Sequence, residues 1–98
     1  MYAIVTRRKM NQARVPETRE RAANEFWPKL QQAPGFVSFS LLQSEDGVGV
    51  ATVVFEEKAH ADAFEGEAAS WATTLNELGH QIESRDEGEV TQHITASP

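Results

Sequence analysis

The chain has 98 residues, no cysteine and a formal net charge of −6. A chain of this length can bury one hydrophobic core, so we expect a single domain over residues 1–98. The acidic balance argues against nucleic acid as a partner, because binding phosphates requires a surplus of Lys and Arg. No apolar run is long enough to cross a bilayer, which argues against a membrane partner. Without cysteine, and without a basic segment before the first apolar run, the chain is expected to be cytoplasmic.

Charge is distributed unevenly along the chain. Up to residue 33 there are seven Lys and Arg side chains against three Glu, whereas the remainder has two basic residues against twelve acidic ones. Such a division could steer an anionic ligand toward the first strand and helix, or pair the basic part of one copy with the acidic part of another. Two solvated surfaces with nothing bound are the simpler and favoured explanation.

The first third of the chain predicts a strand followed by a helix. Residues 2–6 are β-formers, and a loop is expected over residues 9–15. Pro16 suits the first turn of a helix, and apolar residues then recur at spacings of three and four. Pro28 lies inside this pattern and predicts a kink or an early end, whereas Pro34 and Gly35 predict the end itself.

Two strands are expected next, over residues 36–43 and 48–56, joined by a turn at residues 44–47. Strict alternation would place Phe36 with Ser38, Ser40 and Leu42 on one face, and Val37 with Phe39, Leu41 and Gln43 on the other. Both faces then carry apolar side chains. Two helices can cover one face, so we expect a second copy of the sheet to cover the other in a homodimer.

The last third predicts a helix and a final strand. Apolar residues at helical spacing begin at Phe64 and include Trp71, and Gly66 could divide this helix in two. Gly79 is a plausible C-terminal cap. The final strand is expected within residues 81–95, with a bulge at Gly88, and a second copy could exchange it. The order is therefore βαββαβ, an α+β ferredoxin-like subunit with an antiparallel sheet and two helices on one face.

Two stretches resemble a known family. Residues 30–44, with the sequence LQQAPGFVSFSLLQS, and residues 53–60, with the sequence VVFEEKAH, resemble the antibiotic biosynthesis monooxygenase (ABM) family of the dimeric α+β barrel superfamily. Most weight falls on the Pro34-Gly35-Phe36 segment that leads into the second strand. The resemblance implies two sheets packed face to face and a pocket between helices and sheet in each subunit. Members include cofactor-independent oxygenases of polycyclic phenols and quinones, heme-degrading enzymes, and proteins with no demonstrated activity.

The family's catalytic residues are only partly matched. Quinone-oxidising relatives use an Asn and a Trp on the third strand, where this chain has Ala51 and Phe55. Neither side chain can donate a hydrogen bond to a phenolate or a peroxide, so that mechanism does not transfer directly. Heme-degrading relatives combine an Asn on the first strand with a Trp and an axial His on the second helix. Here Trp71 and His80 are of the right types but lie about one turn late, and Thr6 stands in place of the Asn.

Five residues are therefore candidate ligand-binding residues: Thr6, Arg7, Trp27, Trp71 and His80. Each also has a simpler structural explanation. Trp71 lies on an apolar helix face and is typical of core packing, and Trp27 beside Pro28 could face either the core or a pocket. Arg7 could bind an anion or form a surface ion pair, and a lone His is often a surface or capping residue.

Other chemistries have less support. Glu56 with His60, and Glu77 with His80, supply two metal ligands each, where a catalytic zinc needs three. Nucleotide-binding loops and nucleophile motifs are missing from the sequence. We expect no metal and no cofactor, with heme as the one alternative. The sequence thus favours an ABM-like cofactor-independent monooxygenase or small-molecule-binding protein for an aromatic or quinone-like ligand; the alternatives are a non-catalytic stress-response-type barrel and a heme-degrading monooxygenase.

Overall fold

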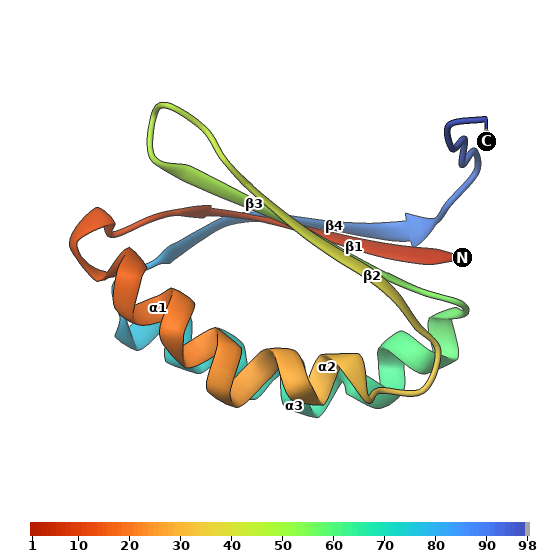
Figure 1. Cartoon of the computed structure of the whole chain (residues 1–98), viewed down its shortest axis with the longest axis horizontal. Helices are drawn as coiled ribbons and strands as arrows, with labels where there is room; N and C mark the ends of the chain where they lie inside the picture. Colours follow the sequence, from red (N-terminus) through yellow and green to blue (C-terminus); the bar gives the residue numbers. More distant parts are fainter. Residues whose placement is uncertain (98) are drawn as a thin grey trace.

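The computed structural model describes residues 1–97 and has the βαββαβ order expected from the sequence. The four strands are β1 (Tyr2–Lys9), β2 (Phe36–Gln43), β3 (Val48–Phe55) and β4 (Gln81–Glu89), and they form one antiparallel sheet in the order β2-β3-β1-β4. All the helices lie on one side of this sheet (Figure 1). The expected α+β ferredoxin-like fold is therefore confirmed.

The first helical region is continuous through its proline. It comprises η1 (Gln12–Arg14), α1 (Val15–Arg21), η2 (Ala22–Phe26) and α2 (Trp27–Gln31), of which η2 is a turn of π-helix. Of the kink and the early end expected at Pro28, the early end does not occur, because the helix runs on to Gln31, and the helical irregularity is the π-turn just before Pro28. Proline lacks an N–H and clashes with the carbonyl four residues earlier, and the wider π-turn just before Pro28 relieves both demands. The loop expected at residues 9–15 is shortened by η1.

The second helix, α3 (Lys58–Glu77), passes through Gly66 without a break, so the expected division there is wrong. Its C-terminus is capped as expected by Gly79, which has φ +86°. The Gly79 N–H donates to the carbonyl of Asn76, and the His80 N–H donates to that of Leu75. This pair of bonds is the Schellman motif, which turns the residue after the glycine back toward the helix.

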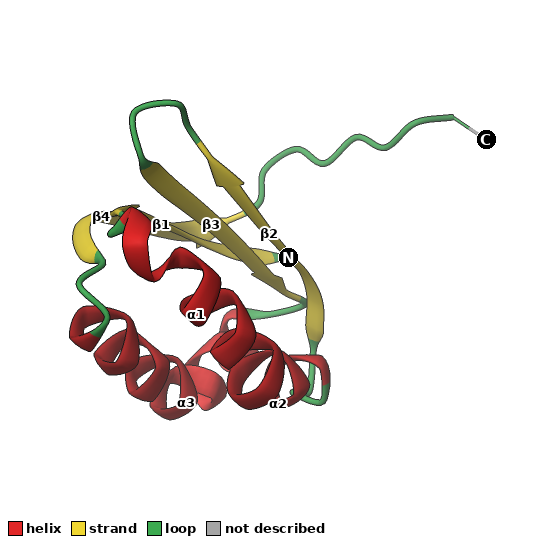
Figure 2. Cartoon of the chain, turned by 60° about the vertical axis from the view of Figure 1, so that its left-hand side comes forward, coloured by secondary structure: helices red, strands yellow, loops and turns green. Residues whose placement is uncertain are grey.

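A bulge in β2 corrects the expected division of that strand's side chains between the two faces. The register with β3 shifts between Phe36 and Ser38, so Phe36 and Phe39 both face the helices. The ring of Phe36 packs edge-on against that of Phe55. The bulge expected at Gly88 is also wrong, because the irregularity in β4 lies opposite the step between Arg7 and Arg8. The strand itself stops at Glu89, and the chain beyond it is extended (Figure 2).

The Pro-Gly-Phe segment has a structural explanation. Gly35 adopts φ +75°, and the ring of His60 lies so close to its Cα that a Cβ would collide with it. The carbonyl of Gly35 accepts a 2.7 Å bond from the N–H of Glu56. The two stretches that resemble the ABM family therefore meet at one corner, where α2 enters β2 and β3 enters α3.

Aromatic rings close one end of the space between helices and sheet. Phe26, Phe55 and Phe64 are buried together, with ring centroids 5.8–5.9 Å apart for the pairs that include Phe64. Tyr2, Leu30 and Ala61 complete this cluster. On the opposite, outer face of the sheet, Val5 pairs with Thr52 and Val54 pairs with Ser38. In the described chain, no helix combines the length and apolar character needed to cross a membrane.

Candidate functional site

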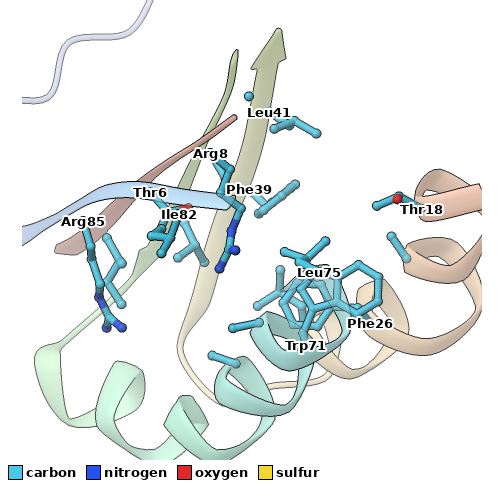
Figure 3. A pocket seen from close by; sticks show the side chains of 18 of the residues that line it. Thr6, Arg8, Thr18, Phe26, Phe39, Leu41, Trp71, Leu75, Ile82 and Arg85 are labelled. Carbon is cyan, nitrogen blue, oxygen red and sulfur yellow. The ribbon is translucent and has the colours of Figure 1, made fainter. Parts of the chain in front are cut away.

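A cavity of about 840 Å³ lies between the inner face of the sheet and the helices. This volume is typical of sites for small organic ligands. Most of its wall is apolar, contributed by all four strands and both helical regions (Figure 3). The wall includes Ile4, Leu41, Val53, Leu75 and Ile82. Leu41 and Ile82 are each 49% exposed although they face inward, so the cleft opens to solvent beside them.

The helical wall presents a stacked aromatic pair. The rings of Phe26 and Trp71 lie 5.2 Å apart between centroids and only 7° from parallel. Trp27 also lines the cavity, although it follows Phe26 directly in the sequence. Phe26 is the last residue of the π-turn η2 and Trp27 follows it, and π-turns recur at functional sites. A flat ligand ring can therefore pack against this wall, because aromatic rings favour offset-stacked arrangements with one another.

The sheet wall carries the polar groups. Thr6 pairs in register with Ala51 on one side and Arg85 on the other, and all three line the cavity. Arg8, two residues further along β1, lines it as well. Side chains alternate along a strand, so Arg7 points to the opposite face. There Arg7 forms a 3.3 Å ion pair with Glu83.

Arg8 has no carboxylate partner among the described residues. Its Nη1 donates to Oδ1 of Asn76 at 3.2 Å and to the carbonyl of His80 at 3.4 Å, and both acceptors are neutral. Burial lowers the pKa of Arg8 from its ordinary value, but a guanidinium stays charged at neutral pH. The cavity therefore contains a positive charge that residues 1–97 do not neutralise.

The other charged groups of the wall differ from Arg8. Arg85 is held between Glu65, at 3.4 Å, and Glu87, at 2.9 Å, and these bonds raise its pKa. Arg19 is exposed on α1. The charged residues that line the cavity are thus three arginines and one glutamate, Glu65, in a protein of net charge −6. The charged side chains that line the cleft thus sum to a positive charge, whereas the protein as a whole is negative.

His80 lies outside the cavity wall and is fully buried, at 0% exposure. Its Nδ1 accepts a 3.0 Å bond from the backbone N–H of Asn11. Its Nε2 lies 2.6 Å from Oγ1 of Thr18, whose own proton goes to the carbonyl of Arg14 at 2.7 Å. Nε2 must therefore carry the hydrogen, and the ring is neutral. Burial, and then the positive charges of Arg8 and Arg14, lower the pKa of His80.

The structure thus brings three of the five candidate residues together. Thr6, Trp27 and Trp71 line one cavity, whereas Arg7 and His80 do not. The sequence reasoning did not identify Arg8 as a residue that lines the cavity. Period-two alternation was the available signal, since Thr6 and Arg7 cannot both face the same side of β1.

Heme does not fit the residues present. None of the chain's three histidines is among the described residues that line the cavity, and both ring nitrogens of His80 are already bonded. The described part of the chain therefore provides no histidine in the cavity to serve as the axial ligand of a heme iron. Across residues 1–97, no cluster of three or more metal-ligating side chains occurs.

Comparisons with known proteins agree on the fold. No family model matches the sequence, and no curated protein matches it. Among solved structures, a candidate antibiotic biosynthesis monooxygenase from Deinococcus radiodurans has a TM-score of 0.78 at 10% identity, with 100% of both chains covered. SnoaB, a cofactor-independent oxygenase from Streptomyces nogalater, has a TM-score of 0.73 at 20% identity, with 97% of each chain covered. MhuD, a heme degrader from Mycobacterium tuberculosis with two hemes bound in its active site, has a TM-score of 0.66 at 18% identity over 97% of this chain and 100% of that one.

These TM-scores show that the chain has the subunit fold that the resemblance implied. The fold alone does not choose an activity, because one scaffold hosts unrelated chemistries. Any choice between an oxygenase, a heme enzyme and a binding protein therefore rests on the side chains of the cavity.

Proposed function

We propose that this protein binds a flat, largely apolar aromatic molecule of the quinone or hydroquinone class in the cleft between its helices and sheet. The observation that carries the proposal is the cavity of about 840 Å³ with the parallel Phe26–Trp71 pair in its wall. Apolar surroundings favour transfer of the ligand from water, and the stacked rings favour a planar one. SnoaB, which shares the fold, is a cofactor-independent oxygenase, and this is consistent with such a ligand.

We propose oxygen chemistry without a cofactor as the activity. In the simplest case, an anthrone-type CH₂ group reacts with O₂, one oxygen atom becomes the new carbonyl, and the other leaves as water with the two hydrogens. The cavity offers the hydroxyl of Thr6 and the indole N–H groups of Trp27 and Trp71 as hydrogen-bond donors to substrate oxygens.

A non-catalytic binding protein is the second candidate, and one observation favours it. The one carboxylate that lines the cavity, Glu65, is engaged by Arg85, and His80 is sealed away. The described residues therefore provide no free general base, which proton abstraction from a substrate would require. An enzyme with this wall would act only on substrates that ionise readily by themselves.

Binding can be tested with 2-naphthamide, a neutral planar probe, by calorimetry and tryptophan fluorescence. Ala72→Phe should abolish binding, because Ala72 lines the cavity and the added ring would fill it. Thr73→Phe is the matched control, since its neighbour Thr73 is exposed and outside the wall. If 2-naphthamide and larger planar rings do not bind, or if Ala72→Phe binds them as well as the wild type does, the proposed function is wrong.

The oxygenase is tested by oxygen uptake with anthrone and a panel of hydroquinones. Formation of anthraquinone should be faster with protein than without, and slower with Ala72→Phe. Binding without any acceleration would identify the second candidate, the non-catalytic protein.

We also propose that a second copy of the chain covers the outer face of the sheet. Leu42 and Leu41 are neighbours on opposite faces of β2, and they are 58% and 49% exposed. Leu42→Lys should shift the protein from dimer to monomer in sedimentation, because a lysine buried in a sheet-to-sheet interface is costly. Leu41→Lys faces the cleft and should leave the dimer intact. A wild-type protein that sediments as a monomer at micromolar concentration would refute the proposal.

A further inference from the structure

Resting on the proposed function, we infer that the aromatic ligand carries a carboxylate, and that Arg8 is the residue that recognises it. Arg8 differs from the other arginines that form short-range contacts. Arg7, Arg14, Arg21 and Arg85 each contact a carboxylate within 3.4 Å, whereas Arg8 contacts only an amide and a backbone carbonyl. A partly buried cation without an anion is unfavourable, so its retention calls for an anionic partner.

The geometry specifies what kind of anion. Both hydrogen bonds of Arg8 within the described chain use Nη1. Its Nε and Nη2 hydrogens form the other edge of the planar group, and two parallel N–H bonds from such an edge match the two oxygens of a carboxylate. In Figure 3 the guanidinium of Arg8 extends from the sheet toward the space beside Trp71 and Leu75. A carboxylate at Arg8 would therefore leave the attached rings near the apolar helical wall.

Asn76 fixes this arrangement. Its Oδ1 orients Arg8 at 3.2 Å without neutralising it, as an aspartate in the same place would do. Arg19, exposed on α1, adds a second positive charge to the wall, whereas Arg85 is engaged by Glu65 and Glu87. The ligand class that fits both the cation and the stacked rings is a planar aromatic carboxylate.

The test compares 2-naphthoate with 2-naphthamide, which have the same rings and nearly the same shape but differ in charge. The wild-type protein should bind the carboxylate at least about tenfold more tightly by calorimetry, because charge-assisted bidentate bonds are worth more than neutral ones. Arg8→Gln should reduce this ratio to about one, chiefly by weakening the binding of 2-naphthoate. Arg7→Gln is the matched control, since Arg7 lies on the other face, and it should keep the full ratio.

Asn76→Asp provides a second route that leaves Arg8 in place. The new carboxylate would pair with Arg8, and the preference for 2-naphthoate should fall as it does in Arg8→Gln. Equal wild-type affinities for the two probes would overturn the inference and leave the proposed function standing. So would an Arg8→Gln variant that loses both ligands equally, or an Arg7→Gln variant that loses the preference. Failure of both probes to bind the wild-type protein would instead contradict the proposed function itself.

Discussion

The cluster around His80 and the cavity wall around Arg8 lie one hydrogen bond apart and use polar side chains in opposite ways. Both polar nitrogens of His80 have partners within the protein, and the side chain has no exposure. Arg8, which donates to the carbonyl of His80, has neutral partners only, and only at Nη1. A buried polar group whose hydrogen bonds are complete stabilises the fold, whereas one with donors to spare is available to a ligand.

The His80 cluster also joins the elements at one end of the cleft. Hydrogen bonds of Asn11, Thr18 and His80 join the loop after β1, helix α1 and the end of α3, and the bond between Thr18 and His80 is buried. Arg8 is attached to the same end of α3 from the sheet. The His80 cluster thus holds the helices in the position from which the Phe26–Trp71 pair faces the sheet.

Replacing His80 is expected to have the largest effect. His80→Ala leaves a buried cavity and removes the partners of the Asn11 N–H and the Thr18 hydroxyl, so the free energy of unfolding should fall by about 3 kcal/mol. Urea denaturation measures this loss, and His93→Ala, at an exposed position, is the control. A loss below about 1 kcal/mol would mean that the cluster does not stabilise the fold, and the contrast with Arg8 would fail.

Thr18→Val tests the hydrogen bond to Nε2 alone, because valine has nearly the same shape as threonine. The His80 N–H would lose its buried acceptor, and the free energy of unfolding should fall by about 1.5 kcal/mol. Thr73→Val is a matched control: its hydroxyl also donates to the carbonyl four residues earlier, at 3.2 Å, but is exposed. Equal losses for the two variants would show that the bond to His80 contributes nothing.

The pH dependence of stability is a smaller effect with a definite sign. Burial and the charges of Arg8 and Arg14 hold the pKa of His80 below the ordinary 6.5. Between the folded and unfolded pKa values the unfolded chain binds more protons, so stability falls as pH decreases below about 6.5. The loss should reach up to about 1 kcal/mol by pH 5.5. His80→Asn should flatten the dependence between pH 5.5 and 7, and a wild-type curve already flat there would contradict it.

The fold was largely predictable because its signals are local. Gly79 marked the end of α3, Gly47 marked the hairpin turn, and alternating apolar residues marked the strands. What failed depended on tertiary context. Pro28 did not end its helix because a π-turn preceded it, and Phe36 changed faces because a bulge inserted one residue in β2. The bulge has no sequence signature of its own, whereas Pro28 indicated an irregular helix without specifying a π-turn.

The site was less predictable, because side-chain direction at element ends is set by motifs that span several residues. His80 looked available by residue type, yet it follows the capping glycine of a Schellman motif, whose geometry turns it inward. Arg7 was chosen over Arg8 because nothing in the sequence fixed which strand face meets the helices. Thr6, Trp27 and Trp71 line the cavity, but the cavity itself appears only when the two helices and the sheet are assembled.

The smallest expected effect is that of Arg8→Gln on stability, and it completes the contrast with His80. The two bonds of Arg8 are long, at 3.2 and 3.4 Å, and one goes to an exposed side chain, so they contribute little. Removing the guanidinium also removes the cost of its partial burial, which offsets that loss. The free energy of unfolding should therefore change by less than about 0.5 kcal/mol. Urea denaturation beside Arg7→Gln measures it, and a loss comparable to that of His80→Ala would make Arg8 a structural residue.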